Sequence, residues 1–236
     1  LACLGGACGW SRPRVVLYGD SLSWEAAGGF QLELHRDARI RISAVPGAAL
    51  CDLLPLVERD AKRPPTVAVL QFSGNNTTPC MRGPDGAPLV GDALLDRYTA
   101  DAEAVTALLV RAGSTVVWAG SPATRTGGQA AALNARYRSI ADAAEARGEP
   151  VRYAPADAAV LSPDGRYADT LPCLPFEGPE RGCIDGRIRV RGPDGVHFCP
   201  TGGDGASPCP VWSSGAFRFG TAMADAAQAA LDERGR

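Results

Sequence analysis

The chain has 236 residues, 45% of them hydrophobic, which is enough to bury a sizeable core, and α/β folds of this length often form one domain. Its 24 basic and 26 acidic residues give a formal net charge of −2 and are scattered, without a basic run that could follow nucleic-acid phosphates. No apolar stretch is long enough to span a bilayer, and no charged segment followed by an apolar one opens the chain. We expect one domain over residues 1–236, a mature protein or an excised soluble domain, with no nucleic-acid partner and no transmembrane segment. A place as one domain of a membrane protein stays open.

Short β-rich runs alternate with longer helical patterns along the first two thirds of the chain. Strands are predicted at residues 14–18, 40–45, 66–72, 115–119 and 151–153, and helices at 21–35, 48–61, 92–112, 129–147 and 213–233. Such alternation predicts a three-layer α/β/α sandwich around a central parallel sheet. Residues 155–212 are rich in Pro, Gly, Asp and Cys with little periodicity, and we interpret them as loops near the active site that disulfides hold.

Eight cysteines form an even set, and only two histidines are present to join them in a metal site. Disulfides are therefore the better interpretation, although four bridges can connect in 105 ways. Close spacing favours the pairs Cys3–Cys8, Cys173–Cys183 and Cys199–Cys209, which leaves Cys51 for Cys80. Disulfides persist in oxidising compartments, so we expect a secreted or extracytoplasmic protein. The alternative is a set of buried free thiols in a cytosolic protein.

The segment Gly19-Asp20-Ser21-Leu22 follows the first predicted strand and opens the first predicted helix. Ser21 therefore lies at the carboxyl edge of a parallel sheet, where active sites of such sheets are found. Backbone N–H groups at a helix N-terminus point toward the space in front of the hydroxyl, where an oxyanion could form. The alternative is a serine that only caps the helix.

Near the other end, Asp194-Gly195-Val196-His197 places a carboxylate three residues before an imidazole. A turn can bring the carboxylate to Nδ1 and leave Nε2 free to take a proton from a serine. The other histidine, His35, lies near the end of a predicted helix without a suggested partner, and we interpret it as a surface or packing residue. The alternative for His197 is a turn histidine that Asp194 caps.

Two further segments follow predicted strands and so fall on the same edge of the sheet as Ser21: residues 46–48 and 73–76. Gly47 could offer an unobstructed backbone N–H and Asn75 a side-chain amide, both suited to binding an oxyanion. Gly, Pro and Asn are also common in ordinary turns, which is the alternative interpretation.

Together these four segments resemble the SGNH hydrolase family, the GDSL esterases and lipases, over residues 14–198. The resemblance implies a flavodoxin-like fold, Ser21 as nucleophile, His197 and Asp194 as its catalytic partners, and an oxyanion hole formed by the Ser21 and Gly47 N–H groups with the Asn75 amide. Two departures are present: Asn76 stands where the family commonly has aspartate, so the register between Asn75 and Asn76 is open, and the asparagine often found upstream of the glycine block is absent.

The expected function is a serine esterase or carbohydrate esterase that cleaves an ester of a small molecule or carbohydrate through an acyl-enzyme, with no metal or organic cofactor. The alternative is an extracytoplasmic O-acyltransferase domain that moves an acyl group onto a surface sugar or other alcohol. A non-catalytic carbohydrate-binding module and a metal-dependent hydrolase fit less well, because the Ser–Asp–His set is present and the late aspartates lack ligand spacing. Most of those aspartates are interpreted as turn residues: Asp157, Asp164, Asp169, Asp185 and Asp204. We assign no binding role to the apolar residues that lie near the site in sequence: Trp24, Phe72, Met81, Phe176 and Phe198.

Overall fold

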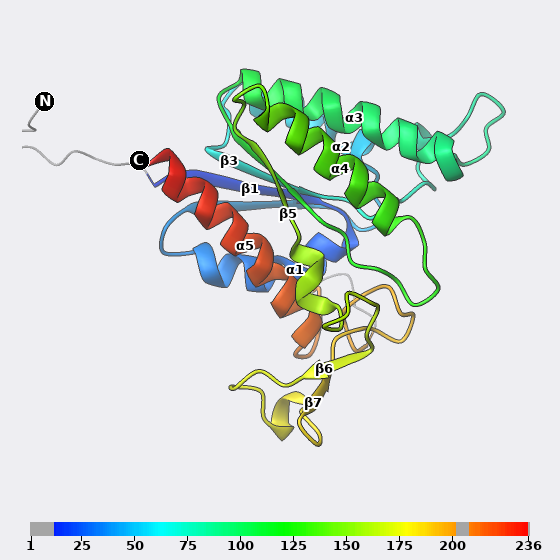
Figure 1. The fold of residues 1–236 in the computed structure, drawn as a ribbon, viewed down its shortest axis with the longest axis vertical. Helices are drawn as coiled ribbons and strands as arrows, with labels where there is room; N and C mark the ends of the chain where they lie inside the picture. Colours follow the sequence, from blue (N-terminus) through cyan, green and yellow to red (C-terminus); the bar gives the residue numbers. More distant parts are fainter. Residues whose placement is uncertain (1–11, 202–207, 236) are drawn as a thin grey trace, which may run out of the picture.

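The computed structural model describes residues 12–201 and 208–235, and its centre is one five-stranded parallel sheet in the order β2-β1-β3-β4-β5 (Figure 1). Its strands are β1 (Arg14–Gly19), β2 (Arg39–Ala44), β3 (Val67–Gln71), β4 (Thr115–Ala119) and β5 (Val151–Ala154). This order is the flavodoxin-like one. The three inner strands are runs of apolar residues buried on both faces, as a parallel sheet covered on both sides requires.

Helices cover both faces of the sheet, so the predicted three-layer sandwich is confirmed (Figure 1). The helices are α1 (Ser21–Leu34), α2 (Leu50–Ala61), α3 (Gly91–Arg111), α4 (Ala130–Glu145) and α5 (Ser214–Arg234). Val16 and Tyr18 of β1 pack toward α2, α3 and α4, whereas Val15 and Leu17 pack toward α1 and α5, because successive strand side chains alternate between faces. Every predicted strand and helix is present with bounds within two residues of the expected ones.

Helices α1 and α5 cross with their backbones close together. A side chain at Gly220 would place its Cβ 2.3 Å from the carbonyl oxygen of Ala26, and one at Gly29 would lie 2.7 Å from the carbonyl oxygen of Phe217. Only glycine fits at either position, so the small residues determine how closely the two helices pack. The crossing therefore fixes α1, whose first residue is Ser21, against the body of the protein.

The loop-rich stretch contains regular structure that the sequence did not predict. Strands β6 (Thr170–Pro172) and β7 (Arg187–Arg189) form an antiparallel pair, and 3₁₀ turns occupy η2 (Ala156–Val160) and η3 (Pro179–Arg181). A further 3₁₀ turn, η1 (Pro79–Met81), lies outside this stretch, between β3 and α3. Three-residue strands are too short to show a period in the sequence. Their stability comes from a small apolar cluster, Leu171, Ile188 and Val190, and from the bridge between Cys173 and Cys183.

Three of the predicted disulfides are confirmed: Cys51–Cys80, Cys173–Cys183 and Cys199–Cys209. The fourth predicted pair, Cys3–Cys8, lies outside the described residues. Across the described part of the chain, none of the helices combines the length and apolar character needed to cross a bilayer.

Candidate active site

Ser21 is the first residue of α1, directly beyond the carboxyl end of β1. The turn between them is tight, because a Cβ at Gly19 would lie 2.1 Å from the Ser23 hydroxyl oxygen and 2.7 Å from the Gln71 carbonyl oxygen. Asp20 caps the helix by accepting a hydrogen bond of 3.0 Å from the Leu22 N–H at Oδ1. The side chain of Ser21 consequently stands at the carboxyl edge of the sheet and at a helix N-terminus, as predicted.

The structure brings Ser21, His197 and Asp194 into one hydrogen-bonded chain. His197 Nε2 lies 2.9 Å from Ser21 Oγ, and His197 Nδ1 lies 2.6 Å from Asp194 Oδ2. The other carboxylate oxygen of Asp194 accepts the N–H groups of Val196 at 2.9 Å and of His197 at 3.0 Å. A proton can therefore pass from the serine hydroxyl to Nε2 while the carboxylate fixes the proton on Nδ1.

The carboxyl group of Asp194 is held in its ionised form. Partial burial acts to raise its pKa, but the hydrogen bonds from the His197 side chain and from the Val196 and His197 N–H groups outweigh burial, and the pKa lies below its ordinary value. The side chains of His197 and Asp194 are 38% and 50% exposed, respectively. The chain of hydrogen bonds is therefore open to solvent along one side, where a second reactant could approach.

Gly47 lies in a tight turn from Val45 to Ala48, closed by a hydrogen bond of 3.1 Å from the Ala48 N–H to the Val45 carbonyl. The φ of Gly47 is +76°, and Pro46 precedes it, which is the arrangement of a type II turn. The N–H groups of Ser21 and Gly47 donate to no acceptor in residues 12–201 or 208–235. Both are thus available to an external oxygen.

Asn75 is anchored beside this turn. Its Nδ2 donates to the Ala48 carbonyl at 3.0 Å and lies 3.5 Å from Asp20 Oδ2, and its own carbonyl accepts the Tyr98 hydroxyl at 2.9 Å. Asn76 points elsewhere, since its Nδ2 donates to the Leu89 carbonyl at 2.8 Å. Asn75, not Asn76, therefore lies beside Asp20 and Ala48.

Asp20 joins the serine segment to the asparagine segment. Its Oδ2 accepts both the N–H and the hydroxyl of Ser73 at 2.6 Å, and the side chain is fully buried. Burial raises the pKa of Asp20 above its ordinary value, although the Ser73 donors and the Leu22 N–H oppose the rise. The sequence placed Asp20 in a motif without predicting this contact, because its partner lies 53 positions away.

Residues 56–207 match the family model described as "Protein of unknown function (DUF459)", which is more than half of the chain. The chain belongs to the DUF459 family. No curated protein matches this chain in sequence.

Solved structures confirm that this DUF459 chain has the α/β fold of GDSL-type enzymes. A putative acylhydrolase from Bacteroides fragilis NCTC 9343 is 15% identical, with 95% of this chain and 88% of that chain covered and a TM-score of 0.55. The GDSL-like lipase from Bacteroides thetaiotaomicron VPI-5482 is 13% identical over 95% of this chain and 90% of that chain, with a TM-score of 0.54. The C-terminal catalytic domain of Streptococcus pneumoniae peptidoglycan O-acetyltransferase A, with a methylsulfonyl adduct, is 17% identical over 93% of this chain and 95% of that chain, with a TM-score of 0.54.

The loop that carries His197 in this DUF459 chain has further anchors that the sequence did not predict. Glu25, on α1, accepts the N–H of Phe198 at 2.6 Å. Arg125 donates to the carbonyl of Pro193 at 3.0 Å, and the fully buried Arg191 donates to the carbonyl of Val196 at 3.3 Å. Each of these hydrogen bonds to the loop ends on a backbone group, so no pairing of residue types in the sequence could reveal it.

The remaining candidates of this DUF459 chain lie outside the cluster. His35 is exposed at the end of α1, with Nδ1 2.6 Å from the Leu32 carbonyl oxygen, in agreement with its predicted surface role. Phe72, Met81 and Phe198 are buried in the core, whereas Phe176 is 47% exposed. The two groupings of possible metal ligands in the described ranges each contain disulfide-bonded cysteines, Cys199 with Cys209 and Cys51 with Cys80, which offer no thiolate to a metal.

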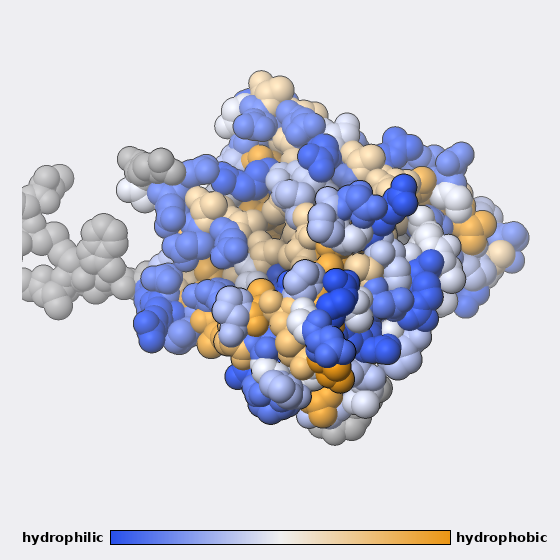
Figure 2. Space-filling model, turned by 60° about the horizontal axis from the view of Figure 1, so that its bottom comes forward, coloured by the Kyte–Doolittle hydropathy of each residue, from blue (hydrophilic) through white to orange (hydrophobic). Residues whose placement is uncertain are grey.

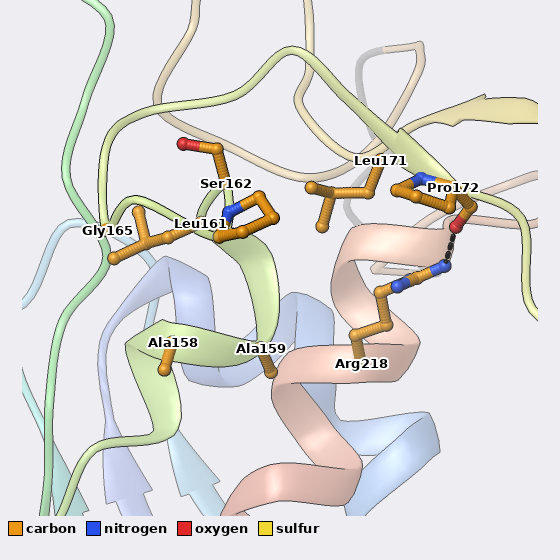
Figure 3. A pocket seen from close by; sticks show the side chains of 9 residues that line it. Ala158, Ala159, Leu161, Ser162, Gly165, Leu171, Pro172 and Arg218 are labelled. Atoms are coloured by element: carbon orange, nitrogen blue, oxygen red, sulfur yellow. Dashed lines mark hydrogen bonds between the residues drawn. The ribbon is translucent and has the colours of Figure 1, made fainter.

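A cavity of about 390 Å³ lies between η2, β6 and α5 (Figure 3). Its wall is mostly apolar, with Leu161 and Leu171 on it, and Arg218 closes one end by donating to the Pro172 carbonyl at 2.6 Å. None of the five candidate site residues lines this cavity. Figure 2 brings the β6–β7 end of the molecule forward and shows apolar side chains scattered among hydrophilic ones.

Proposed function

We propose that this DUF459 protein is a serine esterase of the SGNH type, in which Ser21 forms an acyl-enzyme. The observation that carries the proposal is the hydrogen-bonded chain from Ser21 Oγ through His197 to Asp194, with distances of 2.9 and 2.6 Å. These lie within the range expected of a nucleophile, its general base and the group that orients the base. The similarity to a putative acylhydrolase and a GDSL-like lipase supports the same chemistry.

In the first half of the reaction, His197 Nε2 takes the Ser21 proton while Oγ attacks the ester carbonyl carbon. The oxygen of the tetrahedral intermediate binds the Ser21 and Gly47 N–H groups and the Asn75 amide, and the ionised Asp194 stabilises the imidazolium. His197 then gives its proton to the leaving alcohol as the bond to the carbonyl carbon breaks. In the second half, His197 activates water, which attacks the acyl-enzyme and releases the acid and free Ser21.

A second candidate function is acyl transfer, in which an alcohol replaces water in the second half of the reaction. Its support is the open side of the site, where Asp194 is 50% exposed, together with the similarity to the catalytic domain of a peptidoglycan O-acetyltransferase. The acceptor would be a sugar hydroxyl or another alcohol. The three disulfides in the described part of the chain agree with an extracytoplasmic site of action, where polysaccharide esters and acceptors occur.

The test is hydrolysis of p-nitrophenyl acetate by the oxidised protein and by Ser21→Ala, at about pH 8, where an ordinary imidazole is neutral. We expect turnover that disappears in the variant. Release of p-nitrophenol that rises several-fold when a soluble sugar acceptor is added, with acetylated sugar as product, would favour the transferase. Equal rates for the protein and Ser21→Ala, with and without acceptor, would refute both functions.

A further inference from the structure

Glu25 lies one helical turn after Ser21, so both side chains project from the same face of α1. Its Oε2 accepts the N–H of Phe198 at 2.6 Å and the N–H of Cys199 at 3.3 Å. Phe198 and Cys199 are the two residues that follow His197. One helix therefore carries the nucleophile and also holds the backbone next to its base.

We propose that Glu25 is a positioning residue, whose carboxylate ties the His197 loop to the helix of Ser21 and so determines the separation of Ser21 Oγ and His197 Nε2. This inference rests on the proposed function of the same site. A displacement of about 1 Å between reacting groups can cost about 10²-fold in rate, which makes such an anchor consequential.

The other contacts that hold the His197 loop lead to parts of the chain other than α1. Asp194 bonds within the loop itself, Arg125 ties it to the segment after β4, and the Cys199–Cys209 bridge ties it to the segment before α5. Among the hydrogen bonds of the described residues, only the two that Glu25 accepts connect the loop to α1, apart from the contact between Ser21 and His197. Without Glu25, the contact between Ser21 and His197 would be the one remaining hydrogen bond in the described residues between the loop and α1.

The carboxyl group of Glu25 is partly buried and lies close to other charged groups. Burial raises its pKa above the ordinary value and the negative charge of Asp194 adds to the rise, while the Phe198 N–H, a positive charge on His197 and the Cys199 N–H oppose it. A negative charge at this place also favours the imidazolium that forms when His197 takes the serine proton. The two hydrogen bonds that Glu25 accepts hold the loop, and a negative charge on Glu25 would stabilise the His197 imidazolium in the same sense as the charge of Asp194.

The test measures the reactivity of Ser21 with methanesulfonyl fluoride, because this probe requires no knowledge of the natural ester. Ser21 Oγ attacks the sulfur, fluoride leaves, and the hydroxyl proton passes to His197. We expect Glu25→Ala to slow this modification about 10–10²-fold, since a hydrogen bond to a charged group is removed and the base is displaced. In p-nitrophenyl acetate hydrolysis, kcat should fall by a similar factor while KM changes less than about threefold.

Glu25→Gln keeps an oxygen acceptor of the same length, so it should recover most of the rate lost in the alanine variant. Glu33→Ala, at an exposed position of the same helix, is the matched control and should react like the unaltered protein. Thermal unfolding of each variant checks that the fold persists, and Glu25→Asp, which retracts the carboxylate by one methylene, replaces the alanine variant if that one does not fold.

Sulfonylation of Glu25→Ala or Glu25→Asp at the unaltered rate would overturn the inference while leaving the proposed function intact. Equal losses in Glu25→Gln and Glu25→Ala would also overturn it, because an acceptor alone would then not restore the position. Failure of the unaltered protein to react with the probe or to hydrolyse the ester would instead count against the proposed function.

Discussion

Replacing Asp194 by asparagine should inactivate the site through the tautomer of His197. The Asp194 Oδ1 accepts two backbone N–H groups at 2.9 and 3.0 Å, so the single oxygen of an asparagine will stay with those donors. Its NH₂ group would then face His197 Nδ1, which lies 2.6 Å from the present Oδ2. Nδ1 must then accept a hydrogen bond from this NH₂ group, so the ring proton moves to Nε2. A protonated Nε2 can no longer take the proton of Ser21.

The magnitude follows from the loss of general-base catalysis, which is about 10²–10⁴ in kcat, or about 3–5 kcal/mol in activation free energy. The 50% exposure of Asp194 favours the lower half of this range, since water can compete for the ring nitrogen. The tautomer argument further predicts that Asp194→Ala, which leaves the imidazole free to choose its tautomer, retains at least as much activity as Asp194→Asn.

The assay is steady-state hydrolysis of p-nitrophenyl acetate with kcat and KM separated, and with thermal unfolding measured on the same samples. Asp164→Asn, an exposed aspartate in another loop, is the matched control. A turnover number for Asp194→Asn within about threefold of the unaltered protein would refute the reasoning, because a loss of general-base catalysis costs far more.

Three further predictions follow from the same contacts. Asn75→Ala should lower kcat about 10²–10³-fold in the same assay with little change in KM, and a change confined to KM would contradict a role in binding the oxyanion. The pKa of Asp194 is lowered in the folded protein, so its ionised form stabilises the fold above the unfolded pKa of about 3.9, and this contribution is lost as the pH falls through the folded pKa. In urea unfolding, the stability difference between the unaltered protein and Asp194→Asn should therefore shrink below about pH 4. A difference that stays constant with pH would contradict this. Replacing both Cys51 and Cys80 by alanine opens a loop of 29 residues and should cost about 3–4 kcal/mol in unfolding free energy under oxidising conditions, whereas an unchanged urea midpoint would contradict this estimate.

The fold could be predicted from the sequence because its strands and helices are long and strongly patterned. The run from Val15 to Tyr18 is apolar and is followed by Gly19, a glycine that the structure requires because a Cβ there would meet Ser23. The β6–β7 pair was missed because its strands have three residues each and owe their stability to the Cys173–Cys183 bridge and to packing between Leu171 and Ile188. A local pattern cannot report stability that arises between distant segments.

The site residues were predictable to the extent that their chemistry is local. Asp194 and His197 lie three positions apart, and the structure places their side chains in contact; their roles in catalysis stay predictions. Glu25 left no such signal, because it binds backbone N–H groups 173 and 174 positions away, and every residue type except proline offers the same donor. Side chains that bind backbone groups near an active site therefore cannot be predicted from a single sequence.

The disulfides are placed where they connect stability to the proposed chemistry. Cys51 follows Gly47 by four positions and Cys80 follows Asn75 by five, so one bridge joins the segments of the two proposed oxyanion donors. Cys199 lies two positions after His197, and its bridge to Cys209 holds the loop beside Glu25, whose carboxylate lies within 4.8 Å of both sulfurs. The loops after β1, β2 and β3 and the His197 loop meet at one edge of the sheet, yet they lack the regular hydrogen bonds of helices and strands that would fix them. Covalent bridges and two carboxylates, the buried Asp20 and the partly buried Glu25, supply that constraint instead. A site built on irregular loops would therefore depend on an oxidising compartment.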